Sequence, residues 1–378
     1  MSLAAQAAEI AVPIVYLEQQ VEQPPTLSNL DSLPDDLGLA GAELGIKDNK
    51  TTGAFLGHKY SLESIVVEPG GDLSAAVKRA ASMSKLIVVN APADVMLRIA
   101  DMVETKNALL FNAASQVDDL RNTDCRANVL HTMPSHAMRA DALAQFLKKK
   151  RWTKLALITG SKPSDMAFGN AIRRSGTKFQ LKIVDDRTWE YNADIRRNAA
   201  QEVPLYTQKL AEHDVLVVAD EVHDFGRYFK YNTWEPKLIA GSEGLAPMTW
   251  SPVVEQWGAV QLQNRFKKSA ERGMLSVDYG AWAAVRTVGE AVTRAKTADA
   301  DALRAFILSD KFKLGGHKGR PMNYRAWNGQ LRQTIPLVHP RAVVAMAPLE
   351  GYLHQRTELD TLGLDKPESA CKAFAANN

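Results

Sequence analysis

The sequence predicts an α/β protein of two lobes, each built on a doubly wound parallel sheet. Its 378 residues are more than a usual single core holds, so two domains are expected. Short apolar runs alternate with amphipathic helical stretches, which is typical of parallel sheets covered by helices. The alternation forms two series, the first running to about residue 130, and a mainly helical region follows residue 252.

The expected strands are short apolar runs, beginning with IAVPIVYL, which has the composition of a buried parallel strand. In chain order they cover residues 11–17, 60–67, 86–90, 108–111, 154–159, 179–184, 215–219 and 237–240. The expected helices have apolar residues at spacings of three and four. They cover residues 36–49, 73–83, 93–104, 135–149, 164–175 and 221–229. Asp72 and Ser135 stand at the start of two of these helices and are expected to cap them.

Residues 252–306 are expected to be helical, and a hairpin of edge strands is predicted around the Asn-Gly turn in WNGQ. The chain is expected to cross between the lobes three times, which forms a hinge. The predicted lobes are 9–131 plus 251–334 and 132–250 plus 335–365, with 1–8 as a signal-cleavage remnant or tag and 366–378 as a C-terminal tail. This topology brings the carboxyl ends of both sheets to a cleft, where ligands usually bind.

Composition argues against several functions. The formal charge is only +3, and the one dense basic run, residues 148–151, closes an amphipathic helix, so nucleic-acid binding is not expected. No run of eighteen apolar residues occurs, so no membrane span is predicted. Gly38, Gly41 and Gly45 come about twenty residues too late for a dinucleotide-binding turn, and close helix packing is the better interpretation.

We expect a protein that is not an enzyme and that holds no metal ion, because no catalytic or metal-binding motif is complete. AGSEG has its Ser one residue too early for G-x-S-x-G, and GGHKGR lacks the Walker spacing. LDSLPDD lacks the spacing of a calcium loop. The close acid and His set DEVHD, residues 220–224, is interpreted as a solvated helix start, with a lining of the cleft as the alternative.

Two features bear on the cellular compartment. Ala5-Gln6-Ala7 resembles a signal-cleavage site without the charged and apolar regions that precede one, and a frayed Ala-rich terminus is the alternative. Cys125 and Cys371 are too far apart for a CxxC or zinc motif. They could pair in an oxidising compartment, and two unrelated buried thiols are the alternative.

Four stretches, in their order and spacing, resemble the type I periplasmic solute-binding proteins, which include the leucine/isoleucine/valine-binding proteins of ABC importers. They are DLGLAGAELGIKDNKTTGAFLGHKYSLESIVVEPGGDLSAAVKRAASM, LLFNAASQ, LALITGSKPSDMAFGNAIRR and KLIAGSEG. The resemblance covers nearly the whole chain. It implies the type I periplasmic binding protein fold, with two doubly wound lobes joined by a three-crossover hinge that closes on a ligand. It also implies a periplasmic location, and we expect a monomer.

Within that group the chain looks most like a branch linked with periplasmic alcohol oxidation that depends on pyrroloquinoline quinone (PQQ). This likeness rests on the Pro-rich stretch YLEQQVEQPPTLSNLDSLPDDLGLAGAEL, where amino-acid binders have a short Gly-containing loop. Pro24 and Pro25 are expected to stiffen that loop into a wall of the cleft.

The resemblance also implies ligand contacts at particular positions. The turn formed by Asn112, Ala113, Ala114 and Ser115 matches the segment that holds a ligand carboxylate in amino-acid binders, and Asn90 and Ala91 match a second contacting loop. Phe168 falls where many relatives have a Tyr that covers the ligand. Ser242 and Glu243 lie in GSEG, whose acidic residue matches the one that pairs with an amino-acid ammonium.

PQQ is flat and carries three carboxylates, so its site needs stacking rings and cations. Lys162, Arg187, Trp189 and Trp250 follow strands or a crossing of the second lobe and are the candidates. Each has an alternative: the two Trp residues as core, Arg187 as the partner of Asp185 or Asp186, and Lys162 as an exposed loop charge.

The sequence therefore predicts a periplasmic protein that captures PQQ as a bound ligand rather than as a catalytic cofactor. The partner is expected to be an ABC permease or a PQQ-dependent dehydrogenase. Two alternatives stay open, namely a binding protein for an amino acid or aromatic acid, and a ligand sensor without transport. The amino-acid alternative requires that Glu243 face the ligand and that Arg187 and Lys162 point away from it.

Overall fold

The computed structural model describes residues 9–22, 32–190 and 195–374, which divide into two units. Unit 1 consists of the chain up to Pro134, of Glu255–Gln333 and of the segment from Ser369 onward, and unit 2 consists of Ser135–Val254 and Thr334–Glu368. Each unit contains a parallel sheet with helices, which confirms the predicted α/β class. Pro24, Pro25 and Ala5-Gln6-Ala7 lie outside the described residues, and the predictions made for them stay predictions.

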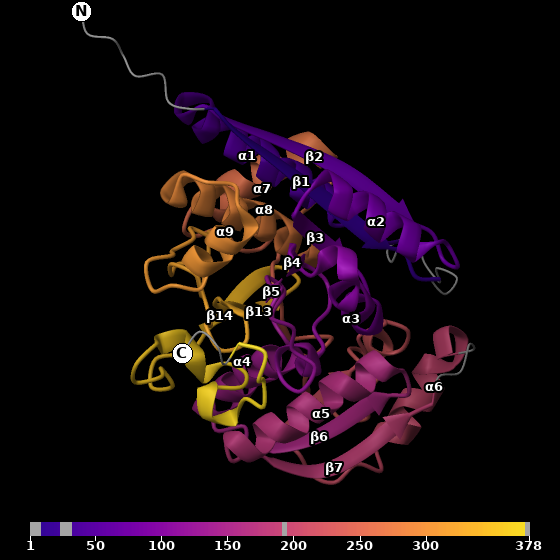
Figure 1. The fold of residues 1–378 in the computed structure, drawn as a ribbon. Helices are drawn as coiled ribbons and strands as arrows, with labels where there is room; N and C mark the ends of the chain where they lie inside the picture. The colour runs from indigo at the N-terminus through magenta and orange to yellow at the C-terminus, as the bar shows by residue number, and fades with distance from the viewer. Residues whose placement is uncertain (1–8, 23–31, 191–194, 375–378) are drawn as a thin grey trace, which may run out of the picture. The chain divides into compact units, whose positions relative to one another are not determined.

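The sheet of unit 1 has the strand order β2-β1-β3-β4-β5, and all of these neighbours are parallel. Its strands are β1 (Ile10–Gln19), β2 (His58–Val67), β3 (Leu86–Asn90), β4 (Leu109–Asn112) and β5 (Val129–His131). Figure 1 shows β1 and β2 side by side, and the two strands pair along their whole length. The first apolar run of the sequence is therefore an inner strand of a doubly wound sheet.

Four helices of unit 1 pack in two ways, one pair against the sheet and the other pair against each other. Alternate residues of the sheet, such as Val15 and Val89, join an apolar cluster with α2 (Leu73–Met83) and α3 (Ala93–Asp101). The second pair is α1 (Leu39–Leu56) and α8 (Ser276–Ala295). A Cβ atom on Gly41 would lie 1.9 Å from the carbonyl oxygen of Asp278 in α8, so only glycine allows this approach. Close helix packing is thus confirmed for Gly41.

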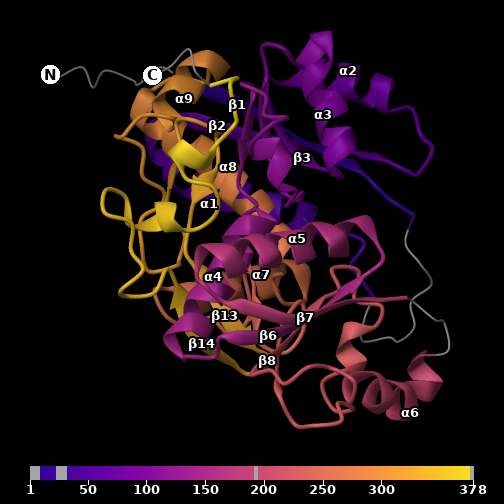
Figure 2. The same ribbon diagram turned by 90° about the horizontal axis from the view of Figure 1, so that it is seen from below.

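The sheet of unit 2 has the order β7-β6-β8-β9 and is also parallel. Its strands are β6 (Lys154–Gly160), β7 (Lys182–Trp189), β8 (Val215–Ala219) and β9 (Leu238–Gly241). Side chains of β8 alternate between two apolar clusters. Val217 packs with α4 (His136–Lys149) and α5 (Pro163–Lys178), and Val218 packs with α6 (Ile195–Thr207). Figure 2 shows α4 and α5 lying next to this sheet.

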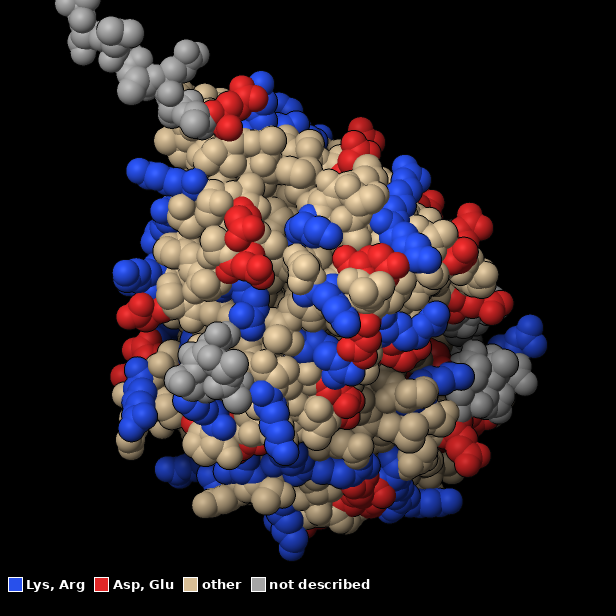
Figure 3. Space-filling view, in the orientation of Figure 1, with Lys and Arg blue, Asp and Glu red and all other residues tan. Residues whose placement is uncertain are grey.

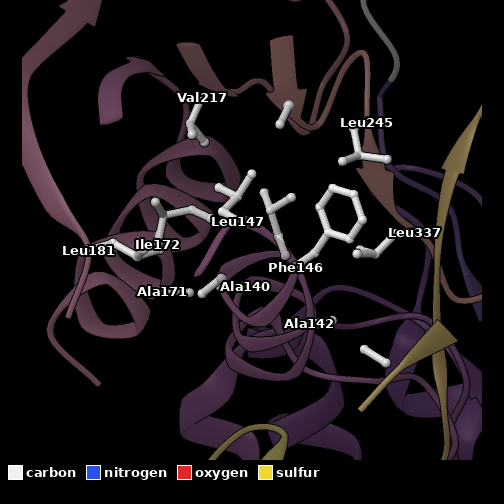
Figure 4. Packing of buried hydrophobic residues seen from close by; sticks show 14 of the residues in the cluster. Ala140, Ala142, Phe146, Leu147, Ala171, Ile172, Leu181, Val217, Leu245 and Leu337 are labelled. Carbon is white, nitrogen blue, oxygen red and sulfur yellow. The ribbon is translucent and has the colours of Figure 1, made fainter. Parts of the chain in front are cut away.

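The cluster beneath α4 and α5 is drawn in Figure 4, where Leu147 lies near Ile172 and Phe146 lies near Leu245 and Leu337. Leu337 belongs to β13 (Ile335–His339), which pairs antiparallel with β14 (Ala342–Ala347) and β10 (Ala246–Pro247). The returning segment of the chain therefore closes the core of unit 2.

The predicted helical region after residue 252 contains α7 (Ala259–Ala270), α8 and α9 (Ala300–Ile307). The predicted hairpin is confirmed as β11 (Asn323–Tyr324) paired antiparallel with β12 (Leu331–Arg332), around the turn that contains Asn328 and Gly329. Gly329 has a φ angle of 69°, the left-handed conformation for which the Asn-Gly pair is suited.

The structure differs from the predicted elements in four main places. The helix expected at 36–49 begins at Leu39 and continues to Leu56 as α1. The expected helix at 221–229 is wrong, because only the short 3-10 turn Gly226–Tyr228 forms there. The strand expected at 179–184 begins later, as β7, because α5 continues to Lys178 and Gln180 takes a φ angle of 56°. The helix α6 was not expected at all, since its sequence carries Pro204 in its interior.

Cys125 and Cys371 form a disulfide within unit 1, which decides between the two alternatives that the sequence left open. The bond joins residues 246 positions apart. Close to it, the backbone N–H of Ala370 donates to the Oδ1 atom of Asn122 at 2.6 Å. The segment from Ser369 onward is therefore tied to unit 1 by covalent and polar contacts.

Charged residues of both signs are intermixed on the face shown in Figure 3, in keeping with the formal charge of +3. Lys and Arg side chains gather in a row along the lower edge of that face. Among the helices that the structure describes, none combines the length and the apolar composition needed to cross a bilayer.

Candidate functional site

Several charged side chains of unit 2 lie at the carboxyl edge of its sheet. Strand β6 ends at Gly160, β8 at Ala219 and β9 at Gly241. The residues that follow these strands are polar, and they include Asp220, Glu221, Ser242 and Glu243. Parallel strands bring such residues to one edge, which is where ligands of doubly wound sheets bind.

Two buried aspartates shape the loops of this edge. Asp220 accepts hydrogen bonds from the backbone N–H groups of Asp224 at 3.1 Å, Phe225 at 3.1 Å and Gly226 at 2.6 Å. These bonds wrap the loop around the carboxylate, which explains why residues 221–229 do not form the expected helix. Asp165, in the first turn of α5, accepts from the backbone N–H of Glu221 at 2.7 Å and of Lys162 at 3.2 Å.

At the centre of the edge, Glu221 forms a buried ion pair with Arg139 of α4. The Nη2 atom of Arg139 donates to Oε1 of Glu221 at 3.1 Å, and Nη1 donates to Oε2. The Oγ of Ser242 donates to Oε1 of Glu221 at 2.7 Å. Burial alone would raise the pKa of Glu221, but Arg139 and these hydrogen bonds outweigh it and lower the pKa to about 2. Glu221 is therefore a fixed anion.

Arg139 also ties neighbouring elements together. Its Nε donates to the carbonyl oxygen of Pro247 at 2.9 Å, and its guanidinium lies 4.5 Å from the centre of the Phe168 ring. The side chain of Arg139 is only 6% exposed. One cation thus joins α4, α5, β10 and the loop after β8 into a fixed frame for the edge.

A second ion cluster, formed by Glu243, Lys230 and His223, lies at the same edge. Lys230 Nζ is 2.7 Å from Oε2 of Glu243, and His223 Nδ1 is 3.3 Å from Oε1. Burial opposes ionisation of Glu243, but the bonds from His223 and Lys230 prevail and lower its pKa. The bond to Glu243 in turn raises the pKa of His223, a side chain that is 61% exposed.

Two other carboxyl groups of this edge hold a proton more tightly than usual. Burial, reinforced by the charge of Asp220, raises the pKa of Asp165 to about 6. Burial and the same neighbour raise the pKa of Asp224 to about 7. Among the described residues, no group of three or more His, Cys, Asp or Glu side chains is arranged to hold a metal ion.

The polar groups at the carboxyl edge of the unit 1 sheet, like those of unit 2, bind one another. Asn90 donates to the hydroxyl of Tyr16 at 3.0 Å and to the carbonyl oxygen of Leu37 at 3.3 Å, and the adjacent Ala91 is buried. Tyr16 donates to Oε2 of Glu18 at 3.2 Å. Asn90 therefore supports the loop after β1.

The turn Asn112, Ala113, Ala114 and Ser115 lies at the end of β4, where the resemblance predicted it to hold a carboxylate. The Oδ1 atom of Asn112 accepts from the backbone N–H of Ser115 at 2.9 Å and of Ala114 at 3.3 Å, and Ala113 is buried. The amides expected to bind a ligand carboxylate are thus already bound by a side chain of the same turn.

Arg121 supports this turn from below and was not foreseen. Its guanidinium donates to the carbonyl oxygens of Ser115 and Met133, both at 2.8 Å, and its Nε donates to Gln330 at 2.8 Å. The side chain is buried, and burial lowers its pKa to about 9. Arg121 thus ties the turn after β4 to the end of β5.

The four residues proposed to hold PQQ are spread over different environments in unit 2. Arg187 binds Asp185 through two bonds of 2.8 Å, which is the alternative stated for it, and Lys162 is exposed. Trp189 is 6% exposed and packs on Phe225 with ring centres 5.9 Å apart, inside an apolar cluster. Trp250 is 1% exposed. The ring of Phe168 is buried beneath Arg139.

Sequence reasoning missed Arg139, Asp165 and Lys230. A usable signal existed for Arg139, because it stands among small and apolar residues in SHAMRADALAQF, a helix buried on nearly all sides. DEVHD was noted as an acid cluster, but its acids were interpreted as facing solvent. The pairing of Arg139 with Glu221, 82 residues later, leaves no trace in sequence spacing.

Comparisons with known proteins agree on the fold. A family model described as periplasmic binding protein matches residues 33–201, which is less than half of the chain. No curated protein matches the sequence. Among solved structures, a branched chain amino acid ABC transporter periplasmic ligand-binding protein from Burkholderia xenovorans LB400 is similar, with a TM-score of 0.71 and 15% identity over 96% of this chain and 100% of that one.

Two further structures have similar coverage. One is a periplasmic binding protein from Burkholderia mallei, with a TM-score of 0.69 and 14% identity over 96% of this chain and 99% of the other. The second is an ABC transporter solute binding protein from R. palustris in complex with benzoate, with a TM-score of 0.64 and 11% identity over 96% of this chain and 99% of the other. The protein therefore has the type I periplasmic binding protein fold.

Proposed function

We propose that this chain is a periplasmic solute-binding protein that captures one small molecule, using the carboxyl edge of unit 2, and serves an ABC transporter. One observation carries the proposal: the buried Arg139–Glu221–Ser242 network fixes two loops at that edge. A buried ion pair is weak evidence for stability, whereas a frame of charged groups held in fixed positions suits the orientation of a ligand. The disulfide fits a protein of an oxidising compartment.

The identity of the ligand stays a prediction. PQQ would need partners for three carboxylates, and the exposed cations at this edge are Lys162 and His223. Of the other predicted contacts, Arg187 has Asp185 as its partner and Trp189 packs in the core. PQQ delivery to a dehydrogenase and sensing without transport stay predictions as well.

The first test is calorimetric titration of the ligand-stripped protein with PQQ, benzoate and leucine, with native mass spectrometry of the protein as purified. We expect saturable one-to-one binding of at least one compound or a co-purified small molecule. A folded protein that binds none of the three and carries no small molecule would contradict the proposal, as would catalytic turnover of any of them.

Two lysines at opposite ends of β6 test whether the ligand binds at the carboxyl edge of the unit 2 sheet. Lys162 follows the carboxyl end of β6 and Lys154 begins the strand at its amino end. Lys162→Ala should weaken binding of an anionic ligand about three- to tenfold, because an exposed charge contributes about 1 kcal/mol. Lys154→Ala should leave affinity unchanged. Equal effects of both variants would show that the carboxyl edge is not the binding surface.

A further inference from the structure

The carboxylate of Glu243 is neutralised by side chains of its own unit. Lys230 Nζ lies 2.7 Å from one carboxylate oxygen and His223 Nδ1 lies 3.3 Å from the other. The side chain of Glu243 is 13% exposed and that of Lys230 is 24% exposed, so this is a partly buried pair rather than a loose surface contact. Both oxygens of Glu243 are therefore in use before any ligand arrives.

The other carboxylates described at this edge are also engaged. Glu221 binds Arg139 and Ser242, and Asp220 accepts three backbone N–H groups. Asp165 accepts hydrogen bonds from the backbone N–H groups of Lys162 and Glu221. Asp224 lies beside Asp220, and burial with that neighbour raises its pKa to about 7, so it carries only part of a charge at neutral pH.

A ligand ammonium group loses its water on binding, and it needs anionic or strongly polar acceptors in exchange. At this edge it could reach Glu243 only by displacing Lys230 from Oε2 or His223 from Oε1. Displacement of Lys230 would leave its ammonium group partly buried without its carboxylate partner, and this loss opposes the exchange. A ligand that has no cationic group avoids this exchange altogether.

We infer that Lys230 supplies from within the protein the positive charge beside Glu243, so that the ligand belongs to the class of small uncharged or carboxylate-bearing molecules without an ammonium group. This inference rests on the proposed function, since it assumes that the carboxyl edge of unit 2 contacts the ligand. It separates aromatic and aliphatic acids, and PQQ with them, from amino acids.

The experiment uses two pairs of probes that differ only in an α-ammonium group, namely 3-phenylpropanoate with phenylalanine and 4-methylpentanoate with leucine. Calorimetry on the wild-type protein should give at least tenfold tighter binding for the acid of a pair than for its amino acid. The variant Lys230→Met removes the partner of Oε2 of Glu243 and should narrow or reverse this preference. Tighter binding of the amino acids by the wild-type protein would overturn the inference.

Lys237→Met is the matched control, because Lys237 pairs with Glu235 at 3.1 Å at the start of β9, away from the carboxyl edge. It should keep the wild-type preference. Thermal unfolding of each variant establishes that it is folded. Lys237→Met could instead change the preference for acids over amino acids as much as Lys230→Met does. The general loss of a positive charge would then be the cause, and the specific role of Lys230 would be contradicted.

A ligand-free measurement separates this inference from the proposed function. The carboxyl carbon of Glu243, followed by NMR against pH, should titrate at higher pH in Lys230→Met than in the wild-type protein. An unchanged titration would overturn the inference whatever the protein binds. A shifted titration with no binding of any probe by the wild-type protein would instead overturn the proposed function, and the ligand class with it.

Discussion

At the scale of single residues, Asp165 links the shape of the unit 2 edge to pH. It accepts backbone hydrogen bonds that hold the loop after β8 in place, yet burial and Asp220 raise its pKa to about 6. A carboxyl group whose pKa is higher in the folded state binds its proton more tightly there than in the unfolded chain. Its stabilising contribution is thus complete below about pH 4 and is lost as the pH rises through about 6.

This loss of stability with rising pH can be tested with Asp165→Asn, in which the side chain is neutral at every pH. Relative to the variant, the wild-type protein should lose free energy of unfolding between pH 4 and pH 7. Denaturant unfolding at pH 4, 5, 6 and 7 measures the difference. Glu190→Gln, which changes an exposed carboxylate next to β7, is the control and should run parallel to the wild type. A parallel curve for Asp165→Asn would contradict the assigned pKa.

How far the sequence predicts single side chains depends on the distance to their partners along the chain. Arg187 and Asp185 lie two residues apart on one face of β7, and their pairing was foreseen as an alternative. The partners of Arg139 and Arg121 are separated from them by up to 82 and 209 residues, so no local pattern reveals them. The ligand contacts carried over from the resemblance stay predictions.

At the scale of elements, the bounds of helices and strands were predicted correctly where a clear apolar periodicity ends at turn residues. The helix α2 and the strands β3 and β8 begin and end where expected, because apolar patterns and turn residues agree there. The loop 220–226 was mispredicted because Asp220 draws three backbone N–H groups to itself. A helix would have left that buried carboxylate without these bonds.

The N-terminus of α2 offers a test at this scale. Asp72 accepts a hydrogen bond from the backbone N–H of Ala75 at 3.0 Å, as the sequence predicted. Asp72→Ala should lower the free energy of unfolding by about 1 kcal/mol, because it removes the cap and a favourable charge at the helix dipole. Urea unfolding followed by circular dichroism measures the loss. Ser74→Ala, two residues later, should have little effect, and an equal loss in both variants would argue against the cap.

At the scale of the whole molecule, the disulfide joins Cys125 and Cys371 of unit 1, 246 positions apart, and the loop that it closes contains all of unit 2. A loop of this length restricts the unfolded chain strongly, and the chain-entropy model gives a stabilisation on the order of 5 kcal/mol. The paired variant Cys125→Ser with Cys371→Ser should therefore unfold at a lower urea concentration than the oxidised wild type.

Reduction of the wild-type protein with dithiothreitol should reproduce the loss of stability seen in the paired variant, and should add nothing to the variant itself. Identical unfolding midpoints for the oxidised, reduced and substituted proteins would contradict a structural role for this bond. The sequence left the pairing open because two cysteines this far apart give no local signature.

The same bond changes what a broken chain looks like. A single cut of the backbone anywhere between Arg126 and Ala370 yields two fragments that stay covalently joined through Cys125 and Cys371. On a gel without reductant, nicked and intact molecules would migrate as one species, and a protease would seem to have no effect. Only reduction of the disulfide would release the fragments. Backbone cleavage in a preparation of this protein therefore has to be assessed on a gel with reductant.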